Sequence, residues 1–149
     1  MSQEERYECL RLEHQLCFPL YACSKEIVRR YKPFLDELDL TYTQYLVMMV
    51  LWEGENIGVK ELGKRLLLDS GTLTPVLKSL ESKGFVQRVR DRSDERALLL
   101  RLTESGKILR EKAIKVPPQI SACLPLSSQE ASTLYALLYK VIGSFASEE

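Results

Sequence analysis

Long apolar runs are missing from this sequence of 149 residues. The longest, YLVMMVLW at residues 45–52, is far shorter than the roughly 20 residues that a membrane-spanning helix needs. The polar and acidic start, MSQEERYE, argues against a signal peptide. We therefore expect a cytoplasmic protein without a membrane partner, in which cysteine thiols stay reduced.

Histidine and paired cysteines are also scarce. His14 is the only histidine, and no CxxC pair occurs among the four cysteines, which are Cys9, Cys17, Cys23 and Cys123. Structural zinc sites are built from such pairs or from several histidines. The sequence therefore predicts neither a metal site nor a cofactor.

Neither sign of charge is in excess, because 21 lysine and arginine residues balance 21 aspartate and glutamate residues. Any affinity for nucleic acid must then come from basic residues gathered in one place. Hydrophobic residues make up 45% of the chain and charged residues 28%, as in globular proteins. With no internal repeat or linker, one domain is expected over residues 1–149.

Apolar residues at steps of three and four predict a long helix over residues 8–38. Pro19 lies inside it and should leave the Gln15 carbonyl without its helical partner, which would kink the helix. Pro33 marks a second bend or break.

The other end of the chain predicts two further helices. One begins near Thr103 and runs to Pro117 and Pro118, and the other begins at Ser127, which has capping-box spacing to Glu130. The terminal helices, residues 8–38 and 103–149, have apolar stripes without an obvious partner, and we expect them to form a dimer interface.

The sequence of residues 41–102 predicts a different arrangement of helices and strands. A buried helix follows Thr41, a short helix covers GVKELGKRLLLD, and another begins at Ser70 as N-cap and stops at Gly84. FVQRVR and ALLLRL then read as two strands around the turn DRSDER. The expected fold class is mainly α with a small β-hairpin wing, a winged helix-turn-helix that is dimeric through its terminal helices.

The helix after Ser70 turns Leu73, Val76, Leu77 and Leu80 inward. The polar residues left for its outer face are candidates for DNA contact through hydroxyl or ammonium groups; they are Ser70, Thr72, Thr74, Lys78 and Ser79. A solvated amphipathic helix would have the same pattern, so this helix alone does not decide the function.

The hairpin favours DNA binding more strongly. Its arginines suit phosphate or minor-groove contact, and they are Arg88, Arg90, Arg92, Arg96 and Arg101. A surface salt-bridge network would use the same composition, and Asp94 could orient Arg96 instead of touching DNA. Beside a helix-turn-helix, this local basicity predicts that the wing binds DNA.

Two stretches of sequence resemble the MarR family of winged-helix repressors. DSGTLTPVLKSLESKGFVQRVRDRSDERALLLRLTESG, residues 69–106, is similar to the family in general. QLCFPLYACSKEIVRRYKPFLDELDLTYTQYL, residues 15–46, is similar to its organic-hydroperoxide-resistance regulator (OhrR) and SarZ-like branch. The last helix is similar in pattern only.

The resemblance implies a homodimer that represses a detoxification gene by binding double-stranded operator DNA. The helix near Ser70 would enter the major groove, and Arg90 or Arg96 would reach a minor groove. Organic hydroperoxide would be the oxidant and Cys17 the sensing thiol, hydrogen-bonded by Tyr31 and Tyr42, which can reach it from the partner subunit. Phe18 and Tyr21 would line its pocket. Cys123 lies in the segment where the two-cysteine members of this branch carry their resolving thiol, without a residue-by-residue match, and is the candidate for that role.

Taken by itself, a cysteine in an apolar helix is most often an inert buried residue. A reactive Cys17 needs a partly exposed pocket with hydrogen-bond donors, which tyrosine hydroxyls can supply. Four functions stay open: a redox-sensing repressor, a MarR-type regulator that binds a small aromatic ligand with Cys17 inert, a thiol peroxidase, and an interaction module without DNA binding. The peroxidase alternative leaves the arginine-rich wing unexplained.

Overall fold

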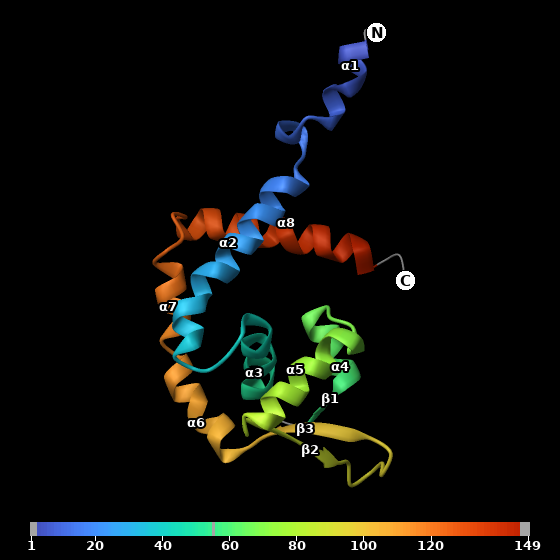
Figure 1. The fold of residues 1–149 in the computed structure, drawn as a ribbon, viewed down its shortest axis with the longest axis vertical. Helices are drawn as coiled ribbons and strands as arrows, with labels where there is room; N and C mark the ends of the chain where they lie inside the picture. The colour runs from blue at the N-terminus through green and yellow to red at the C-terminus, as the bar shows by residue number, and fades with distance from the viewer. Residues whose placement is uncertain (1–2, 55, 147–149) are drawn as a thin grey trace. The chain divides into compact units, whose positions relative to one another are not determined.

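The computed structural model describes residues 3–54 and 56–146, and the chain separates into two compact units (Figure 1). The first unit spans Met1–Val116 and the second Pro117–Glu149. Among the described residues, no helix combines the length and the apolar character that crossing a membrane requires.

The prediction of one continuous helix over residues 8–38 is wrong for the first part of that range. A short helix α1 (Gln3–Tyr7) and two 3₁₀ turns (Glu8–Leu10 and Leu12–His14) precede α2, which spans Cys17–Asp36. Pro19 falls in the first turn of α2, where no helical partner needs its missing N–H. The Gln15 carbonyl accepts the N–H of Phe18 at 3.2 Å instead, so Pro19 starts this helix and the predicted kink is absent. Pro33 lies inside α2 and does not break it.

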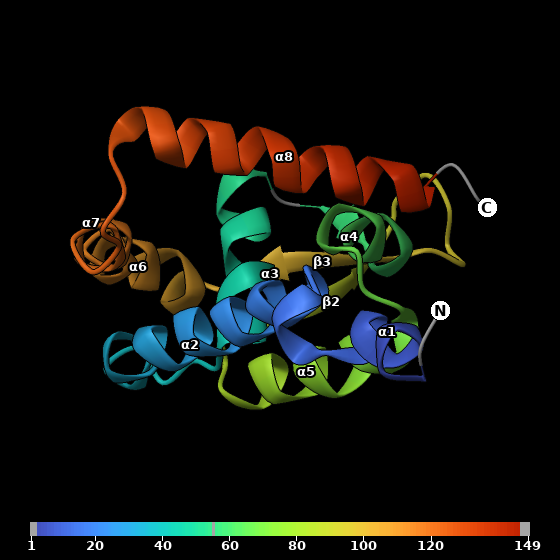
Figure 2. The ribbon, with the colours of Figure 1, turned by 90° about the horizontal axis from the view of Figure 1, so that it is seen from above.

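Helix α3 (Tyr42–Glu53) is the centre of the first unit. Its start is fixed by the predicted capping box, in which Thr41 accepts the N–H of Gln44 and the Gln44 side chain accepts the N–H of Thr41. Its apolar side chains are buried almost all round. Helix α3 contacts α2, and it also contacts α4 (Val59–Leu66), α5 (Ser70–Ser82), α6 (Glu104–Ala113) and strand β3 (Leu98–Leu102) (Figure 2). Packing against these elements explains why its sequence shows no polar face.

The predicted helix-turn-helix is present as α4 (Val59–Leu66) and α5 (Ser70–Ser82). The N-cap of α5 is Asp69, whose carboxylate accepts the Thr72 N–H at 2.7 Å, so the assignment of Ser70 as N-cap is one residue late. A carboxylate is as good a cap as a hydroxyl and also carries the charge that a helix start favours. Gly84, with a φ of +75°, follows the end of α5 as predicted.

The wing is a three-stranded antiparallel sheet in the order β1-β3-β2. Strands β2 (Val86–Arg90) and β3 (Leu98–Leu102) are the predicted hairpin, in register from Val86 opposite Leu102 to Arg90 opposite Leu98. Strand β1 (Ile57–Gly58) has only two residues, too short to show an alternating pattern in the sequence, and was not predicted.

The predicted helix from Thr103 to the proline pair is two helices. Thr103 caps α6 (Glu104–Ala113), and α7 (Val116–Ser121) begins immediately before Pro117 and Pro118. Prolines are tolerated in a first turn, so this pair lies within the start of a new helix instead of ending the old one. In the second unit, α8 (Ser128–Ala146) begins at the predicted Ser127–Glu130 capping box, with both of its bonds formed.

Candidate functional site

Cys17 is the first residue of α2, and its side chain is exposed. The three other cysteines are exposed and free as well. Around Cys17, large apolar side chains face solvent, including Leu16 at 76% exposure and Phe18 at 44%. Tyr21 is one turn further along α2, and the Lys25 ammonium lies 5.0 Å from its ring centre. Cys17 therefore lies in an apolar surface that the single chain leaves uncovered.

Tyr31 and Tyr42 pack against each other, which is the arrangement that a shared site needs. Their ring centres are 4.9 Å apart, and Tyr31 also lies 5.9 Å from Tyr45. Partial burial raises the pKa of both Tyr31 and Tyr42. Both hydroxyls therefore stay protonated at neutral pH and can donate a hydrogen bond.

Cys17 and Tyr31 cannot meet within one chain. They lie fourteen residues apart on α2, which separates them by about 21 Å along a straight helix. A hydrogen bond between Tyr31 and a Cys17 thiol therefore has to join two subunits, as the resemblance implies.

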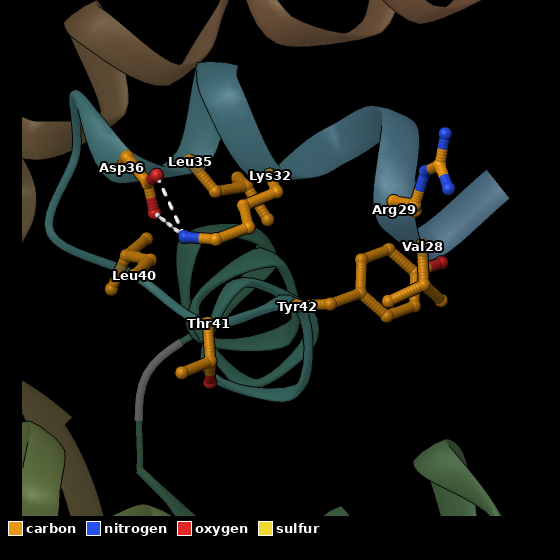
Figure 3. Close-up of a pocket in the computed structure, with 8 residues that line it drawn as sticks. All are labelled: Val28, Arg29, Lys32, Leu35, Asp36, Leu40, Thr41 and Tyr42. Atoms are coloured by element: carbon orange, nitrogen blue, oxygen red, sulfur yellow. Dashed lines mark hydrogen bonds and ion pairs between the residues drawn. The ribbon is translucent and has the colours of Figure 1, made fainter. Parts of the chain in front are cut away.

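A cavity of about 280 Å³ lies between α2 and α3, with Tyr42 in its wall (Figure 3). It is lined by Val28, Arg29, Lys32, Leu35, Asp36, Leu40, Thr41 and Tyr42. The Tyr42 ring points toward Val28, and Lys32 turns to Asp36, whose two carboxylate oxygens it approaches at 2.9 and 2.8 Å. The cavity thus combines an apolar wall and an aromatic ring with a neutralised ion pair.

Tyr45 is a member of the tyrosine cluster that the sequence analysis missed. It is 3% exposed, three residues after Tyr42 on α3, and it continues the aromatic contacts to Trp52 at 6.3 Å. The signal was present in the spacing of Tyr42 and Tyr45, which places both rings on one side of a helix. The apolar run that follows them, which predicts only a buried helix, concealed it.

Cys123 lies in the second unit, in the turn between α7 and α8. Its thiol donates to the Gln119 carbonyl at 3.3 Å, and the side chain is exposed. The residue is therefore accessible to a reacting thiol, as a resolving cysteine has to be.

The outer face of α5 holds four of the five predicted polar residues. Ser70, Thr72, Thr74 and Lys78 are exposed. Thr72 donates to the Asp69 carboxylate, and Thr74 donates to the Ser70 carbonyl at 2.7 Å. Both hydroxyl oxygens keep their acceptor capacity, so each can still bond a donor on a base or bridge through water.

Ser79 was predicted for the same face, and that prediction is wrong. Its hydroxyl accepts a hydrogen bond from the Nε2 of Gln44 at 2.9 Å, and Gln44 is buried in α3. The Lys83 ammonium completes this contact by donating to the Gln44 Oε1 at 3.1 Å. Ser79 therefore joins α5 to α3, because a buried amide needs its polar partners.

The arginines of the wing divide into two groups. The Nε of Arg88 lies 3.1 Å from a Glu81 carboxylate oxygen, both side chains being about 30% exposed, so Arg88 is drawn back toward α5. In the part of the chain that the structure describes, no hydrogen bond or ion pair holds the guanidinium of Arg90, Arg92 or Arg96. These three present unpaired guanidinium groups to solvent, whereas the exposed Arg101 donates to the side-chain oxygen of Asn56.

The acidic residues of the wing shape its tip. Asp91 accepts the N–H and the hydroxyl of Ser93, at 2.9 and 2.8 Å, and these bonds lower the pKa of its carboxyl. Asp94 accepts the backbone N–H of Arg96 at 3.0 Å. Asp94 thus orients the backbone at Arg96, one of the two roles that the sequence left open.

Comparison with known proteins gives the family. The profile described as Transcriptional regulator SarA/Rot matches residues 29–112, more than half of the chain. The chain belongs to the SarA/Rot family of transcriptional regulators. This SarA/Rot regulator is 45% identical to the organic hydroperoxide resistance transcriptional regulator of Bacillus subtilis, over 93% of its own length and 95% of the relative's. It is 44% identical to SarZ of Staphylococcus haemolyticus, over 89% and 90% of the two chains. The predicted MarR-type family and its hydroperoxide-regulator and SarZ branch are therefore confirmed.

Solved structures agree with this assignment. The SarA/Rot regulator matches reduced AbfR bound to DNA with a TM-score of 0.76 and 36% identity, over 95% of its length and 99% of that chain. It matches a disulfide form of AbfR with a TM-score of 0.63, 38% identity and coverage of 95% and 99%. AbfR comes from Staphylococcus epidermidis. The predicted winged-helix fold is confirmed.

Proposed function

We propose that this protein is a thiol-based redox-sensing repressor that binds operator DNA as a homodimer and is released when organic hydroperoxide oxidises Cys17. The observation that carries the proposal is the similarity, over nearly the whole chain, to a hydroperoxide-resistance regulator, in a chain whose Cys17 thiol is exposed. In this proposal the protein acts as a regulator and not as an enzyme, and it works in the cytoplasm.

The position of Cys17 suits the sensing step. The exposed thiol at the start of α2 can be reached by a peroxide from solvent. The thiolate attacks one peroxide oxygen, the O–O bond breaks, and the leaving alkoxide takes up a proton to become an alcohol. Cys17 is thereby oxidised to a sulfenic acid and the peroxide is reduced.

The tyrosine pair supplies the hydrogen bonds. Tyr31 and Tyr42 keep their protons at neutral pH and lie side by side, so both hydroxyls can donate to one thiolate. Since Tyr31 is too far along α2 to reach Cys17 of its own chain, the pocket is shared between subunits. Phe18 and Tyr21 add apolar surface that an alkyl peroxide can contact.

Exposed apolar surface at both ends of the chain supports the dimer. Near Cys17 it includes Leu12, Leu16 and Phe18, and on α8 it includes Leu134, Leu137, Val141 and Phe145. Such surface is unfavourable in water and marks an interaction site. The terminal helices, residues 8–38 and 103–149, therefore form the dimer interface, and residues 41–102 form the DNA-binding region.

DNA contact belongs to α5 and the wing. Two α5 helices related by a two-fold axis enter successive major grooves through Ser70, Thr72, Thr74 and Lys78. Arg90 and Arg96 of the wing reach an adjacent minor groove, with Asp94 orienting the backbone at Arg96. Arg88 is the weakest of the arginine contacts, because Glu81 already neutralises it.

A mobility-shift experiment tests the whole proposal. The reduced protein should retard DNA from its own upstream region, and stoichiometric cumene hydroperoxide should release it. Cys17→Ser should bind the same DNA and stay bound in peroxide, whereas Cys23→Ser, which removes an exposed cysteine on the same helix, should respond like wild type. Failure of the reduced protein to bind, or release of Cys17→Ser by peroxide, would refute it.

The cavity beside Tyr42 favours one second candidate, a regulator controlled by a small aromatic ligand with Cys17 inert. Its wall offers an aromatic ring and apolar side chains, which an aromatic ligand can contact. This candidate predicts release of Cys17→Ser and wild type alike by such a ligand, and no release of either by peroxide.

A further inference from the structure

A network of polar side chains joins the turn between α2 and α3 to the last turn of α5. Its centre is the side-chain amide of Gln44, which is 5% exposed. The Gln44 Oε1 accepts the Thr41 N–H at 3.0 Å and a bond from the Lys83 ammonium at 3.1 Å. The Gln44 Nε2 donates to the Ser79 hydroxyl at 2.9 Å. We call Gln44, Ser79 and Lys83 the polar joint.

Lys83 is the residue of the polar joint that reaches the turn. Its ammonium donates to the Asp39 carbonyl and to Gln44, and it lies 3.3 Å from an Asp39 carboxylate oxygen. An ammonium has three N–H donors, so these three acceptors occupy all of them. Asp39 has a φ of +54°, a left-handed conformation that aspartate adopts more readily than most residues. Lys83 therefore holds the turn at the residue where its backbone is least ordinary.

Ser79 and Lys83 attach α5 at two points on one face. They are four residues apart, about one helical turn, and the Lys83 N–H donates to the Ser79 carbonyl at 3.0 Å. Lys83 is also the C-cap of α5, where the helix dipole favours a positive charge. Apolar contacts are not directional, whereas hydrogen bonds are. Two directional attachments one turn apart therefore fix the angle of α5 against α3 as well as its distance.

The polar joint begins in the same helical turn as a tyrosine of the proposed sensing pocket. Tyr42 and Gln44 are the first and third residues of α3, and Tyr45 of the tyrosine cluster follows Gln44 directly. A movement of this first turn therefore moves the Tyr42 hydroxyl and the Gln44 amide together. Because Gln44 is bonded to Ser79 and Lys83, the same movement is passed to α5.

We propose that the residues of the polar joint are positioning residues that transmit the redox state of Cys17 to α5. The inference rests on the proposed function, because it needs Tyr42 to bind the Cys17 thiolate and α5 to enter the operator. When organic hydroperoxide converts the thiolate to a sulfenic acid, Tyr42 loses its charged hydrogen-bond partner. The first turn of α3 then shifts, and the polar joint changes the angle of α5 with it. No residue of the polar joint touches the thiol or the DNA.

DNA affinity in both redox states tests this proposal. Fluorescence anisotropy, with DNA from the chain's own upstream region, gives the ratio of affinities between the reduced full chain and the chain treated with stoichiometric cumene hydroperoxide. Lys83→Met and Ser79→Ala should each lower this ratio by roughly 2- to 30-fold, as residues that couple two sites do. Trapping with dimedone should show that Cys17 is still oxidised at the wild-type rate.

Ser82→Ala is the matched control, because the Ser82 hydroxyl bonds the Lys78 carbonyl within α5 and takes no part in the polar joint. It should keep the wild-type ratio. Ser79→Ala removes one hydroxyl and suits a helix, so it preserves the test if Lys83→Met lowers the stability of the fold.

The salt dependence of binding separates positioning from direct contact. Removing a lysine that contacts a phosphate lowers the slope of log K against log salt by about 0.9, whereas Lys83→Met should keep the wild-type slope. A lower slope would overturn the proposal by making Lys83 a DNA contact. An unchanged ratio between the redox states, whatever the affinity of the reduced variant, would overturn it by limiting the polar joint to the stability of the fold. Failure of wild type to bind DNA, or to be released by peroxide, would overturn the proposed function instead.

Discussion

At the scale of single residues, the arginines of the wing differ in what they can still bind. Arg88 is held by Glu81, whereas Arg96 is exposed and its backbone is oriented by Asp94. We therefore expect Arg96→Ala to weaken DNA binding by roughly 1–3 kcal/mol, the cost of losing a groove contact. Anisotropy with operator DNA measures it, with Arg88→Ala as the matched control that should lose less. Equal losses for both variants would show that the Glu81 contact does not withhold Arg88 from DNA.

The tyrosine pair predicts a dependence of stability on alkaline pH. Burial raises the pKa of Tyr31 and Tyr42 in the folded chain above the ordinary value of about 10. Their stabilising contribution is therefore complete below about pH 10 and is lost as the pH rises through the folded pKa. Urea unfolding midpoints should fall across that range, and Tyr42→Phe should fall less steeply than wild type. Parallel curves would mean that Tyr42 titrates alike in both states.

The sequence could predict these residues singly but not their juxtaposition. Tyr31 and Tyr42 followed from the resemblance, but their tilted ring contact at 4.9 Å depends on the turn that brings α2 back against α3. Ser79 was misplaced because the buried amide of Gln44, which binds it, lies 35 residues away. Contacts between residues so far apart in the chain leave no periodic signal in a sequence. Hydrogen bonds within one helical turn leave a recognisable spacing of residue types.

At the scale of elements, helix starts were predictable where a side chain caps the backbone within three residues. The Thr41–Gln44 and Ser127–Glu130 boxes are both formed. Prolines were harder to interpret. Periodicity alone predicts a helix that continues through Pro19 and another that ends at Pro117 and Pro118, but all three prolines lie in the first turn of a helix. A proline removes a donor that a first turn does not use, so the same residue either breaks a helix or starts one.

The start of α6 leaves no room for a side chain at Gly106. A Cβ on Gly106 would lie 2.1 Å from the Phe85 carbonyl oxygen, and the Gly106 carbonyl accepts the Trp52 indole N–H at 2.9 Å. Gly106→Ala should therefore lower the free energy of unfolding by about 3 kcal/mol or more, since backbone has to shift.

Gly54→Ala is the control for that variant, because its Cβ meets nothing within 4 Å and its φ of −167° suits any residue. Its free energy of unfolding should stay within about 0.5 kcal/mol of wild type. Urea denaturation compares the two, and equal stability of both variants would contradict the tight packing of α6.

At the scale of the whole molecule, both ends of the chain expose apolar surface. The apolar side chains around Cys17 and along α8 face solvent in a single subunit, and they lie on the elements predicted to dimerise. The proposed shared pocket also explains why Cys17 lies at the start of α2 and Tyr31 lies toward its other end. In the proposed dimer, the start of one α2 would lie near the end of the other. Sensing would then be a property of the pair of subunits, and oxidation of Cys17 would act on both α5 helices together.

The same reasoning predicts the oxidised form. After peroxide converts Cys17 to a sulfenic acid, the thiol of Cys123 of the partner subunit attacks its sulfur, and the oxygen leaves as water. The resulting disulfide needs Cα atoms within roughly 7 Å, and the exposed turn between α7 and α8 is a segment that can move to meet that limit. Its movement would tilt the terminal helices and change the spacing of the two α5 helices, which releases the operator.

A non-reducing gel after stoichiometric organic hydroperoxide measures this outcome. Wild type should run as a covalent dimer, and Cys17→Ser and Cys123→Ser should both run as monomers. Cys9→Ser and Cys23→Ser should still form the dimer. Cys23 is six residues from Cys17 on α2 and therefore on another face of that helix, and Cys9 precedes α2 altogether. A covalent dimer of Cys123→Ser would exclude Cys123 as the resolving thiol. A monomeric wild type that is nevertheless released from DNA would assign that role to a small thiol, because the sulfenic acid then ends as a mixed disulfide within each subunit.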